Sequence, residues 1–289
     1  MKKTPLIAAP ALISVAIMWG AAFVLMKPAI EKQPIFDFLA TRFTIAVLVM
    51  ILVRPSVLKL IRLDMLKVGA PLGVILGGGY ITQTIALQET TAAITGFLTG
   101  LYVVLTPLFA WLAFRQRVAR KVWAAVTLAT AGLALISITG LSIQVGQIWG
   151  VICAVLFAAH IVGLGRWSPG RDAYALTVLQ LGFAGVVCWI GALGDGYQAP
   201  PTDDVWFAVL FTAVLATAFA FFIQTWAQGI MDASRVAIIL TSEVVFAAAI
   251  SVAVGQEILT LQTLLGGALM VAAMLLVEWP SRRSKALYG

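Results

Sequence analysis

The feature that most constrains this chain is a series of continuous apolar runs, each of roughly 20 residues, that recurs along its whole length. A helix of that length crosses about 30 Å of hydrocarbon, the thickness of a bilayer core. Because lipid offers the peptide backbone no hydrogen-bond partner, a segment that crosses it must be a helix or part of a closed barrel. These runs do not alternate between apolar and polar residues, which argues against a barrel. The sequence therefore predicts an all-α membrane protein.

The composition agrees with this prediction. Hydrophobic residues make up 62% of the chain and charged residues 11%, whereas soluble domains contain about 45–50% and about 25%. The first apolar run follows Lys2 and Lys3 as in a signal peptide, but it is too long for the apolar part of one. We therefore expect an uncleaved first helix.

The net charge of +7 raises the question of a nucleic-acid partner. The basic residues form neither one patch nor a motif interleaved with aromatic residues, so no such partner is expected. Cys153 and Cys188 lie in separate apolar runs, without CxxC spacing or a His cluster. Neither a metal site nor a disulfide framework is expected from them, and no cofactor is predicted.

Ten membrane-spanning helices account for the apolar runs. Two of the connections are short, at Gln88–Ala92 and Gly229–Arg235, where a charge beside small or hydroxyl residues favours a tight turn over one long helix. Pro107 lies inside the fourth span and is expected to kink it. The predicted spans are 7–26, 36–53, 68–88, 92–114, 122–139, 148–165, 174–194, 205–227, 235–254 and 261–279.

Basic residues are distributed unevenly between the two sides of this ten-helix arrangement. If the N-terminus is cytoplasmic, 16 of the 19 Lys and Arg residues fall in cytoplasmic segments, while Lys27 and Lys32 lie outside and Arg42 lies within the second span. Short cytoplasmic loops carry an excess of Lys and Arg, so this bias predicts that both termini are cytoplasmic. The 16 residues are Lys2, Lys3, Arg54, Lys59, Arg62, Lys67, Arg115, Arg117, Arg120, Lys121, Arg166, Arg171, Arg235, Arg282, Arg283 and Lys285.

The two halves of the chain match weakly at a fixed offset. At 141 positions, "ITQTIALQ" (Ile81–Gln88) lies over "FIQTWAQG" (Phe222–Gly229), and Tyr102 falls on Glu243. At 138 positions, Trp19-Gly20 falls on Phe157-Ala158. Such self-similarity indicates an internal repeat.

The expected repeats are residues 1–140 and residues 141–289, the second with a short basic tail. Each contains five spans. Because five is an odd number, the second repeat must enter the membrane upside down relative to the first. Inverted repeats of this kind build a central site near the membrane midplane that opens alternately to the two sides. The pattern therefore predicts a secondary transporter.

Several stretches of the sequence resemble the EamA-type family of the drug/metabolite transporter superfamily, and the resemblance extends over essentially the whole chain. The first half departs from the family pattern, because Tyr102 and Gln116 stand where acidic residues are usual; in the second half Val244 replaces the usual proline. The resemblance implies export of a small metabolite or drug without naming it. The stretches are "MWGAAFV" (Met18–Val24), "FLATRFTIAVLVM" (Phe38–Met50), "LYVVLTPLFAWLAFRQR" (Leu101–Arg117), "SEVVFAAAISVAVGQE" (Ser242–Glu257) and "LGGALMVAAMLL" (Leu265–Leu276).

Three ionisable residues, Arg42, His160 and Glu243, lie inside predicted spans, where a charge is costly and usually functional. Glu243 is about 12 Å from the cytoplasmic end of its span at 1.5 Å per residue. It could bind a substrate amine, exchange a proton, or pack between helices in its neutral form. Arg42 could extend to the membrane interface or bind a carboxylate. His160 could join two helices or shuttle protons.

Polar residues at helical spacing form stripes in repeat-equivalent spans, as expected for a water-filled cavity between the halves. Hydrogen bonds between helices are the alternative explanation. The stripes are Thr95, Thr99, Tyr102 and Thr106; Thr217, Phe221, Gln224 and Gln228; and Tyr80, Gln83 and Thr84. With aromatic walls added, the predicted substrate site consists of Trp19, Arg42, Tyr80, Gln83, Thr99, Tyr102, His160, Gln224, Trp226 and Glu243.

We therefore expect a multi-pass transporter of the cell membrane, in bacteria the inner membrane, that exports a small metabolite. Thr, Gln and aromatic residues beside a few charges favour an amino acid or similar amphiphile. Proton-coupled efflux of lipophilic cations, with Glu243 as the counter-charge, is the alternative. A membrane enzyme or sensor is the rival from another class, although no HExxH, GxSxG or GxxxxGK[ST] motif is present. The expected partners are the substrate and the lipid bilayer, and proton coupling is left open. One chain suffices to form a transport pathway, and a dimer is the alternative.

Overall fold

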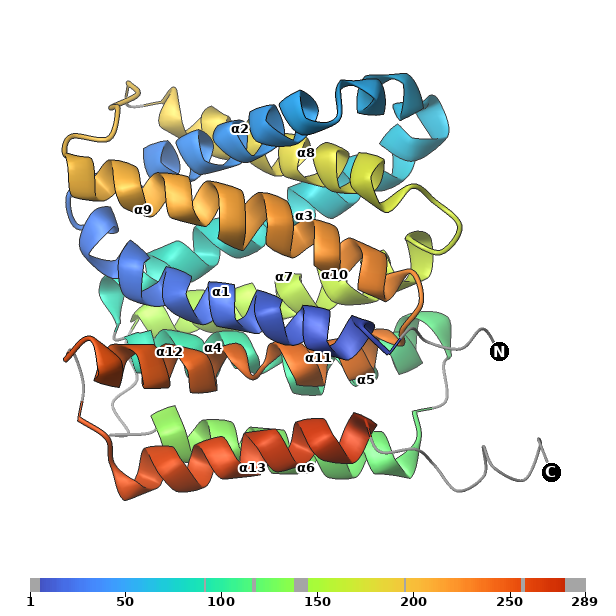
Figure 1. Cartoon of the computed structure of the whole chain (residues 1–289), viewed down its shortest axis with the longest axis vertical. Coiled ribbons are helices and arrows are strands. Elements are labelled where there is room, and N and C mark those ends of the chain that lie inside the picture. The colour runs from blue at the N-terminus through green and yellow to red at the C-terminus, as the bar shows by residue number, and fades with distance from the viewer. Residues whose placement is uncertain are drawn as a thin grey trace.

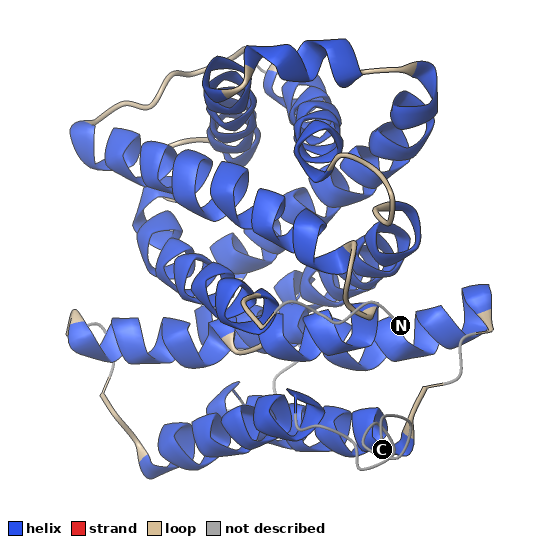
Figure 2. Ribbon diagram, turned by 45° about the vertical axis from the view of Figure 1, so that its right-hand side comes forward, coloured by secondary structure: helices blue, strands red, loops and turns tan. Residues whose placement is uncertain are grey.

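A computed structural model describes residues 6–90, 92–115, 118–137, 145–194, 196–255 and 258–278, and within these ranges every regular element is helical (Figures 1 and 2). The elements are α1 (Ala8–Ile30), α2 (Ile35–Val53), η1 (Pro55–Leu60), α3 (Leu63–Glu89), α4 (Ala92–Gly100), α5 (Tyr102–Phe114), α6 (Arg120–Ser137), α7 (Val145–Trp167), α8 (Ala173–Ala192), α9 (Asp203–Ala213), η2 (Val214–Phe219), α10 (Ala220–Gln228), α11 (Ala233–Leu240), α12 (Glu243–Ala253) and α13 (Leu261–Glu278).

The helices are stacked in layers with their axes running between the same two ends of the molecule (Figure 1). The α2–α8 pair lies at one edge of the stack, the α6–α13 pair at the other, and α1, α7 and α10 lie between them. Seven helices in the described ranges are long and apolar enough to cross a membrane, and Leu98–Phe114 and Leu261–Val277 are shorter apolar helices. The chain is a multi-pass membrane protein.

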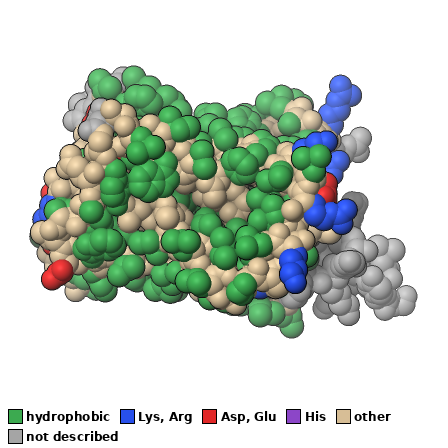
Figure 3. Space-filling view, turned by 90° about the horizontal axis from the view of Figure 1, so that it is seen from above, with side chains coloured by type: hydrophobic (Ala, Val, Ile, Leu, Met, Phe, Trp, Pro, Cys, Tyr) green, Lys and Arg blue, Asp and Glu red, His purple; other side chains and the backbone are tan. Residues whose placement is uncertain are grey.

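The helix boundaries follow the predicted spans closely where the structure describes them. Separate helices form at both short connections: α3 ends at Glu89 before α4 begins at Ala92, and α10 ends at Gln228 before α11 begins at Ala233. The start of α1 and the end of α13 lie at the same end of the stack (Figure 1). Figure 3 shows most of the visible Lys and Arg side chains at that end, and apolar side chains over the flank between the ends.

Two helical pairs are interrupted halfway, α4–α5 at Leu101 and α11–α12 at Thr241–Ser242. At each break the backbone tightens: the Leu101 N–H donates to the Leu98 carbonyl at 3.2 Å, and the Ser242 N–H donates to the Ile239 carbonyl at 3.1 Å. The residues that follow the breaks, Tyr102 and Glu243, are 141 positions apart. Pro107, where a kink was expected, lies inside α5 and the interruption precedes it.

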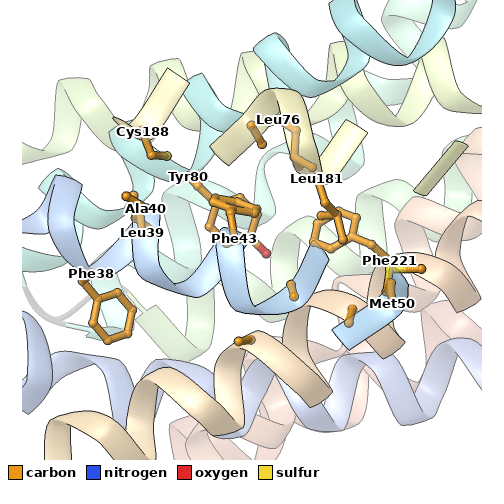
Figure 4. Close-up of a cluster of buried hydrophobic side chains, with 14 of the residues drawn as sticks. Phe38, Leu39, Ala40, Phe43, Met50, Leu76, Tyr80, Leu181, Cys188 and Phe221 are labelled. Carbon is orange, nitrogen blue, oxygen red and sulfur yellow. The ribbon is translucent and has the colours of Figure 1, made fainter. Parts of the chain in front are cut away.

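Among the described residues, aromatic and aliphatic side chains of α1, α2, α3, α8 and α9, with Phe221 of α10, form the largest buried cluster, part of which Figure 4 shows. Phe43 and Tyr80 meet edge to face there, with ring centroids 5.4 Å apart. Glycines let α3 approach α8 closely: a methyl group at Gly73 would collide with the Gln180 carbonyl, and one at Gly77 would lie 3.1 Å from the Ala184 carbonyl. Small residues at such contacts are how helices pack tightly in lipid.

Gly20 has the same role where α1 crosses α12. A methyl group added there would lie 2.7 Å from the backbone nitrogen of Ala247 and 2.8 Å from the carbonyl of Glu243. Because backbone cannot yield as a side chain can, we expect Gly20→Ala to destabilise the protein by about 1–3 kcal/mol. Thermal unfolding in detergent would measure this.

The matched control is Gly182→Ala in α8, because nothing lies within 4 Å of the added methyl group at that position. Both substitutions improve intrinsic helix propensity equally. The difference between their melting temperatures therefore reports the contact between α1 and α12. Equal melting temperatures for the two variants would contradict that contact.

Candidate functional site

A cavity lies between α1, α2, α3, α5, α7, α10 and α12, at the point where α5, α10 and α12 begin. Its volume is about 40 Å³, room for a few water molecules. A larger molecule therefore needs the walls to move apart. The lining residues are Trp19, Ala22, Phe23, Met26, Arg42, Leu76, Tyr80, Gln83, Tyr102, Phe157, His160, Ile161, Phe221, Gln224 and Glu243.

Arg42 brings a positive charge to this cavity from α2, and its side chain is 1% exposed. Its Nε donates to the Thr217 hydroxyl at 2.6 Å, Nη1 faces the Met26 sulfur at 3.2 Å, and Nη2 makes a long contact of 3.4 Å with the Tyr80 hydroxyl. The guanidinium also lies 4.7 Å from the Tyr80 ring centroid. Among the described residues no carboxylate pairs with it. Arg42 thus does not extend to the membrane interface and lacks the anion that a buried guanidinium normally binds.

Glu243 brings a carboxyl group to the same cavity. It is the first residue of α12 and the central residue of the span Ala233–Ala253, with 3% of its surface exposed. The Tyr102 hydroxyl donates to its Oε1 at 3.4 Å, which is a long hydrogen bond. The carboxyl group therefore lies halfway along this apolar span, in contact with Tyr102, the first residue of α5.

Aromatic rings form the wall around the Arg42 guanidinium and the Glu243 carboxyl group. The Tyr80 ring centroid lies 5.5 Å from that of Phe157 and 6.0 Å from that of Phe221, and Trp19 and Phe221 are 5.5 Å apart. The Trp19 Nε1 donates to the Ala216 carbonyl at 2.8 Å, inside the π-helical turn η2. Because Arg42 binds Thr217 of the same turn, two cavity side chains hold η2. Such π-turns occur frequently at functional sites.

His160 joins the cavity to the helices behind it. Its Nε2 lies 2.7 Å from Oε1 of Gln180 on α8, and the Gln180 amide nitrogen donates to the Thr225 hydroxyl at 2.8 Å. With the Gln180 amide nitrogen donating to Thr225, Oε1 is the Gln180 atom that faces Nε2 of His160, and the two form a buried hydrogen bond. The arrangement is the helix-to-helix contact that was one of the two expectations for this residue.

Gln224 on α10 belongs to a second buried chain of hydrogen bonds, which we call the Gln224–Gln228 relay. Its Nε2 donates to Oε1 of Gln228 at 3.0 Å, and Nε2 of Gln228 donates to the Ile161 carbonyl at 2.6 Å. Oε1 of Gln224 is buried and has no hydrogen-bond partner among the described residues. The cavity thus has an acceptor that no described protein donor satisfies.

The cavity lies between helices from both halves of the chain, and comparison with known proteins decides the family. The model of the EamA-like transporter family matches residues 6–138 and again residues 144–279. The chain belongs to the EamA-like transporter family. The charged, aromatic-walled cavity described above is therefore the candidate substrate site of an EamA-type transporter.

Similar proteins carry transporter names without a substrate. This EamA-type transporter is 32% identical over 265 residues to an uncharacterized transporter of Archaeoglobus fulgidus, covering 91% of the chain and 83% of the relative. It is 27% identical to the uncharacterized transporter YvbV of Bacillus subtilis, covering 99% and 96%. A solved crystal structure matches with a TM-score of 0.78 at 17% identity, covering 98% of this chain and 99% of the other. At that identity the likeness concerns the fold alone.

Most of the predicted site residues of this EamA-type transporter lie on one cavity. Thr99 and Trp226 do not line it. Thr99 lies behind Gln83, whose amide nitrogen is 3.5 Å from its hydroxyl, and Trp226 packs against a neighbouring apolar cluster. Those that line the cavity are Trp19, Arg42, Tyr80, Gln83, Tyr102, His160, Gln224 and Glu243.

The predicted site omitted the remaining lining residues. They are apolar, and nothing in an apolar run separates a cavity-facing side chain from a lipid-facing one. Two had a usable signal: Phe157 matches Trp19 at the 138-position offset, and Phe221 belongs to a polar stripe. The omitted residues are Ala22, Phe23, Met26, Leu76, Phe157, Ile161 and Phe221.

Proposed function

We propose that this EamA-type transporter is a secondary transporter that exports a small zwitterionic metabolite, an amino acid or a similar amphiphile, by alternating access. One observation supports this most directly: a single aromatic-walled cavity contains a buried guanidinium without a carboxylate partner and a buried carboxyl group with one long contact. A zwitterion presents both complementary charges at once. A substrate of one sign would leave one of the two groups without a partner.

The proposed architecture is ten spans in two inverted five-helix repeats, residues 1–140 and 141–289, in the bacterial inner membrane. The interruptions support it, since α4 and α11 begin 141 positions apart, as do α5 and α12. The basic end of the molecule, where α1 begins, would face the cytoplasm. One chain surrounds the cavity, so a monomer suffices.

Alternating access requires contacts that close the two ends of the pathway in turn. At the end opposite the basic one, Lys27 of α1 donates to the carbonyls of Leu87 at 2.5 Å and Thr90 at 3.1 Å, at the C-terminal end of α3. A lysine ammonium suits such a helix end, where carbonyl groups lack intrahelical partners. We propose that this Lys27 clasp holds the outer end closed.

We expect Lys27→Met to increase outward opening about two- to fivefold, because a partly exposed charged contact is worth about 0.5–1 kcal/mol. The measurement is the rate at which a membrane-impermeant thiol reagent labels a cysteine placed at Ala22, in protein lacking Cys153 and Cys188. Lys32→Met is the control, since Lys32 pairs with exposed Asp204 and does not hold α3. Equal labelling of both variants would contradict the clasp.

The second candidate function is proton-coupled efflux of lipophilic cations. Glu243 and the rings of Trp19, Tyr80, Phe157 and Phe221 would suit such a substrate, because aromatic faces attract cations. Arg42 opposes it: a cation would enter a cavity that already contains a buried positive charge. We therefore place this function second.

The deciding experiment is counterflow into proteoliposomes of the wild-type protein, with amino acids and cationic dyes as alternative substrates. Exchange of amino acids without exchange of dyes supports the proposed function. Exchange of dyes alone would replace it with the second candidate.

A further inference from the structure

The orientation of the Gln224 amide group is set by the backbone. The Ile161 carbonyl can only accept a hydrogen bond, so the amide nitrogen of Gln228 must face it. Oε1 of Gln228 then points to Gln224 and accepts from its amide nitrogen. Oε1 of Gln224 is consequently the free end of the relay, and a flip of either amide would place two like groups against each other.

The free oxygen has the properties of a ligand contact. Gln224 is 1% exposed and lines the cavity, so bulk water does not satisfy its oxygen. A buried acceptor without a donor costs free energy until a donor arrives. An amide oxygen takes only donors, so the group expected here carries N–H or O–H hydrogens. Glu243, on the same cavity, favours a donor that is also positively charged.

Arg42 provides the group in the cavity that would bind a substrate carboxylate. Its Nε is held firmly by Thr217 at 2.6 Å, which fixes the plane of the guanidinium. Nη1 and Nη2 have weaker partners, a thioether sulfur and a phenol oxygen at 3.4 Å. A carboxylate can displace both and form the charge-assisted pair that arginine favours, without disturbing the bond to Thr217.

We propose that the cavity binds its substrate in one orientation, with the carboxylate on Arg42 and a primary ammonium on Oε1 of Gln224 and on Glu243. The inference rests on the proposed function and narrows its substrate class to zwitterions with N–H donors. Gln228 is a positioning residue that aims Gln224. A quaternary amine has no N–H for Gln224, and a simple carboxylate or a simple amine satisfies only one end of the cavity.

The test is direct binding to the purified protein, by titration calorimetry, of four ligands that share one side chain. They are leucine, isoamylamine (no carboxylate), isocaproate (no amine) and the N-trimethyl betaine of leucine. We expect wild-type protein to bind leucine at least about tenfold more tightly than each of the others, the factor for one lost charge-assisted hydrogen bond.

Two variants test whether Gln224 contributes a hydrogen bond to the ligand or only packs against its neighbours. Gln224→Leu is expected to weaken leucine binding about tenfold or more and to leave isocaproate binding unchanged. Gln228→Met leaves Gln224 in place but releases its amide, so the preference for leucine over isocaproate should fall by severalfold. The control is Gln262→Leu, an exposed side chain on α13, a helix that contributes no lining residue to the cavity. Thermal unfolding of each variant establishes that it is folded.

The outcomes distinguish this inference from the proposed function. If wild-type protein binds leucine and the betaine equally, or if Gln224→Leu and Gln228→Met keep the preference for leucine over isocaproate, the orientation is wrong while zwitterion transport stands. If leucine does not bind but a cationic dye does, the proposed function itself fails. A lowered preference for leucine over isocaproate in both variants, with binding of isocaproate retained, supports the inference.

Discussion

Replacing Arg42 by leucine is expected to lower exchange of a zwitterionic substrate by about 30-fold or more. The estimate follows from the cost of removing one partner of a buried charge pair, about 2–5 kcal/mol, at about 1.4 kcal/mol per factor of ten. Arg42→Lys should recover only part of the activity, because an ammonium cannot reproduce the planar fork of the guanidinium. Counterflow in proteoliposomes measures both variants.

Arg42→Leu should not destabilise the protein. The substitution removes the hydrogen bond to Thr217 that helps hold η2, but it also removes a buried charge that has no carboxylate partner among the described residues, and the cost of desolvating such a charge offsets the lost bond. Lost exchange with an unchanged or raised melting temperature would show that Arg42 contributes to substrate binding and not to the stability of the fold. Lost exchange with a lowered melting temperature would instead make it a structural residue.

The matched control for Arg42 is Arg54→Leu. Arg54 pairs with Asp172 at 3.1 Å where both side chains are partly exposed, and such surface pairs contribute about 0–1 kcal/mol. We expect nearly normal exchange from this variant. A loss as large as that of Arg42→Leu would show that the effect is not specific to the cavity.

The second large effect is expected from Glu243→Gln, which keeps the shape of the side chain and removes its charge. An ionised Glu243 pairs with a substrate ammonium, whereas the neutral form does not, so exchange by the wild-type protein should weaken on mild acidification. The Gln variant should resemble the neutral form at every pH, with exchange lower by about tenfold and no pH dependence. Counterflow at a mildly acidic and a mildly alkaline pH measures this.

Tyr102→Phe is the companion variant for Glu243, because it removes the one hydroxyl that, in the described part of the chain, donates to the carboxyl group, and it leaves the ring. We expect it to keep a pH dependence, since the carboxyl group is still present. A Glu243→Gln variant with the exchange rate and pH profile of the wild type would make Glu243 a packing residue. The source of any pH dependence would then lie elsewhere, with His160 as the next candidate.

The helices and their ends were predictable because they depend on local chemistry. Apolar runs of sufficient length must be helical in lipid, whichever residues they face. Short polar connections mark their ends, as at Glu89–Ala92 and Gln228–Ala233, where the structure places separate helices. The polar stripes were predictable only in part: Gln83, Tyr102 and Gln224 line the cavity, whereas the other Thr and Gln residues of the stripes do not.

The environment of each side chain was decided by packing between helices that are distant in the sequence. Arg42 could equally have extended to the interface; its burial depends on Thr217, which lies 175 positions away, and on the Tyr80 ring. The direction of the Gln224 amide depends on a backbone carbonyl of α7. Thr99 and Trp226 share helical faces with cavity residues yet lie behind or beside them. In a membrane both the lipid-facing and the cavity-facing surfaces of a helix are largely apolar, so hydrophobicity along one helix does not distinguish them, and only contacts with the other helices do.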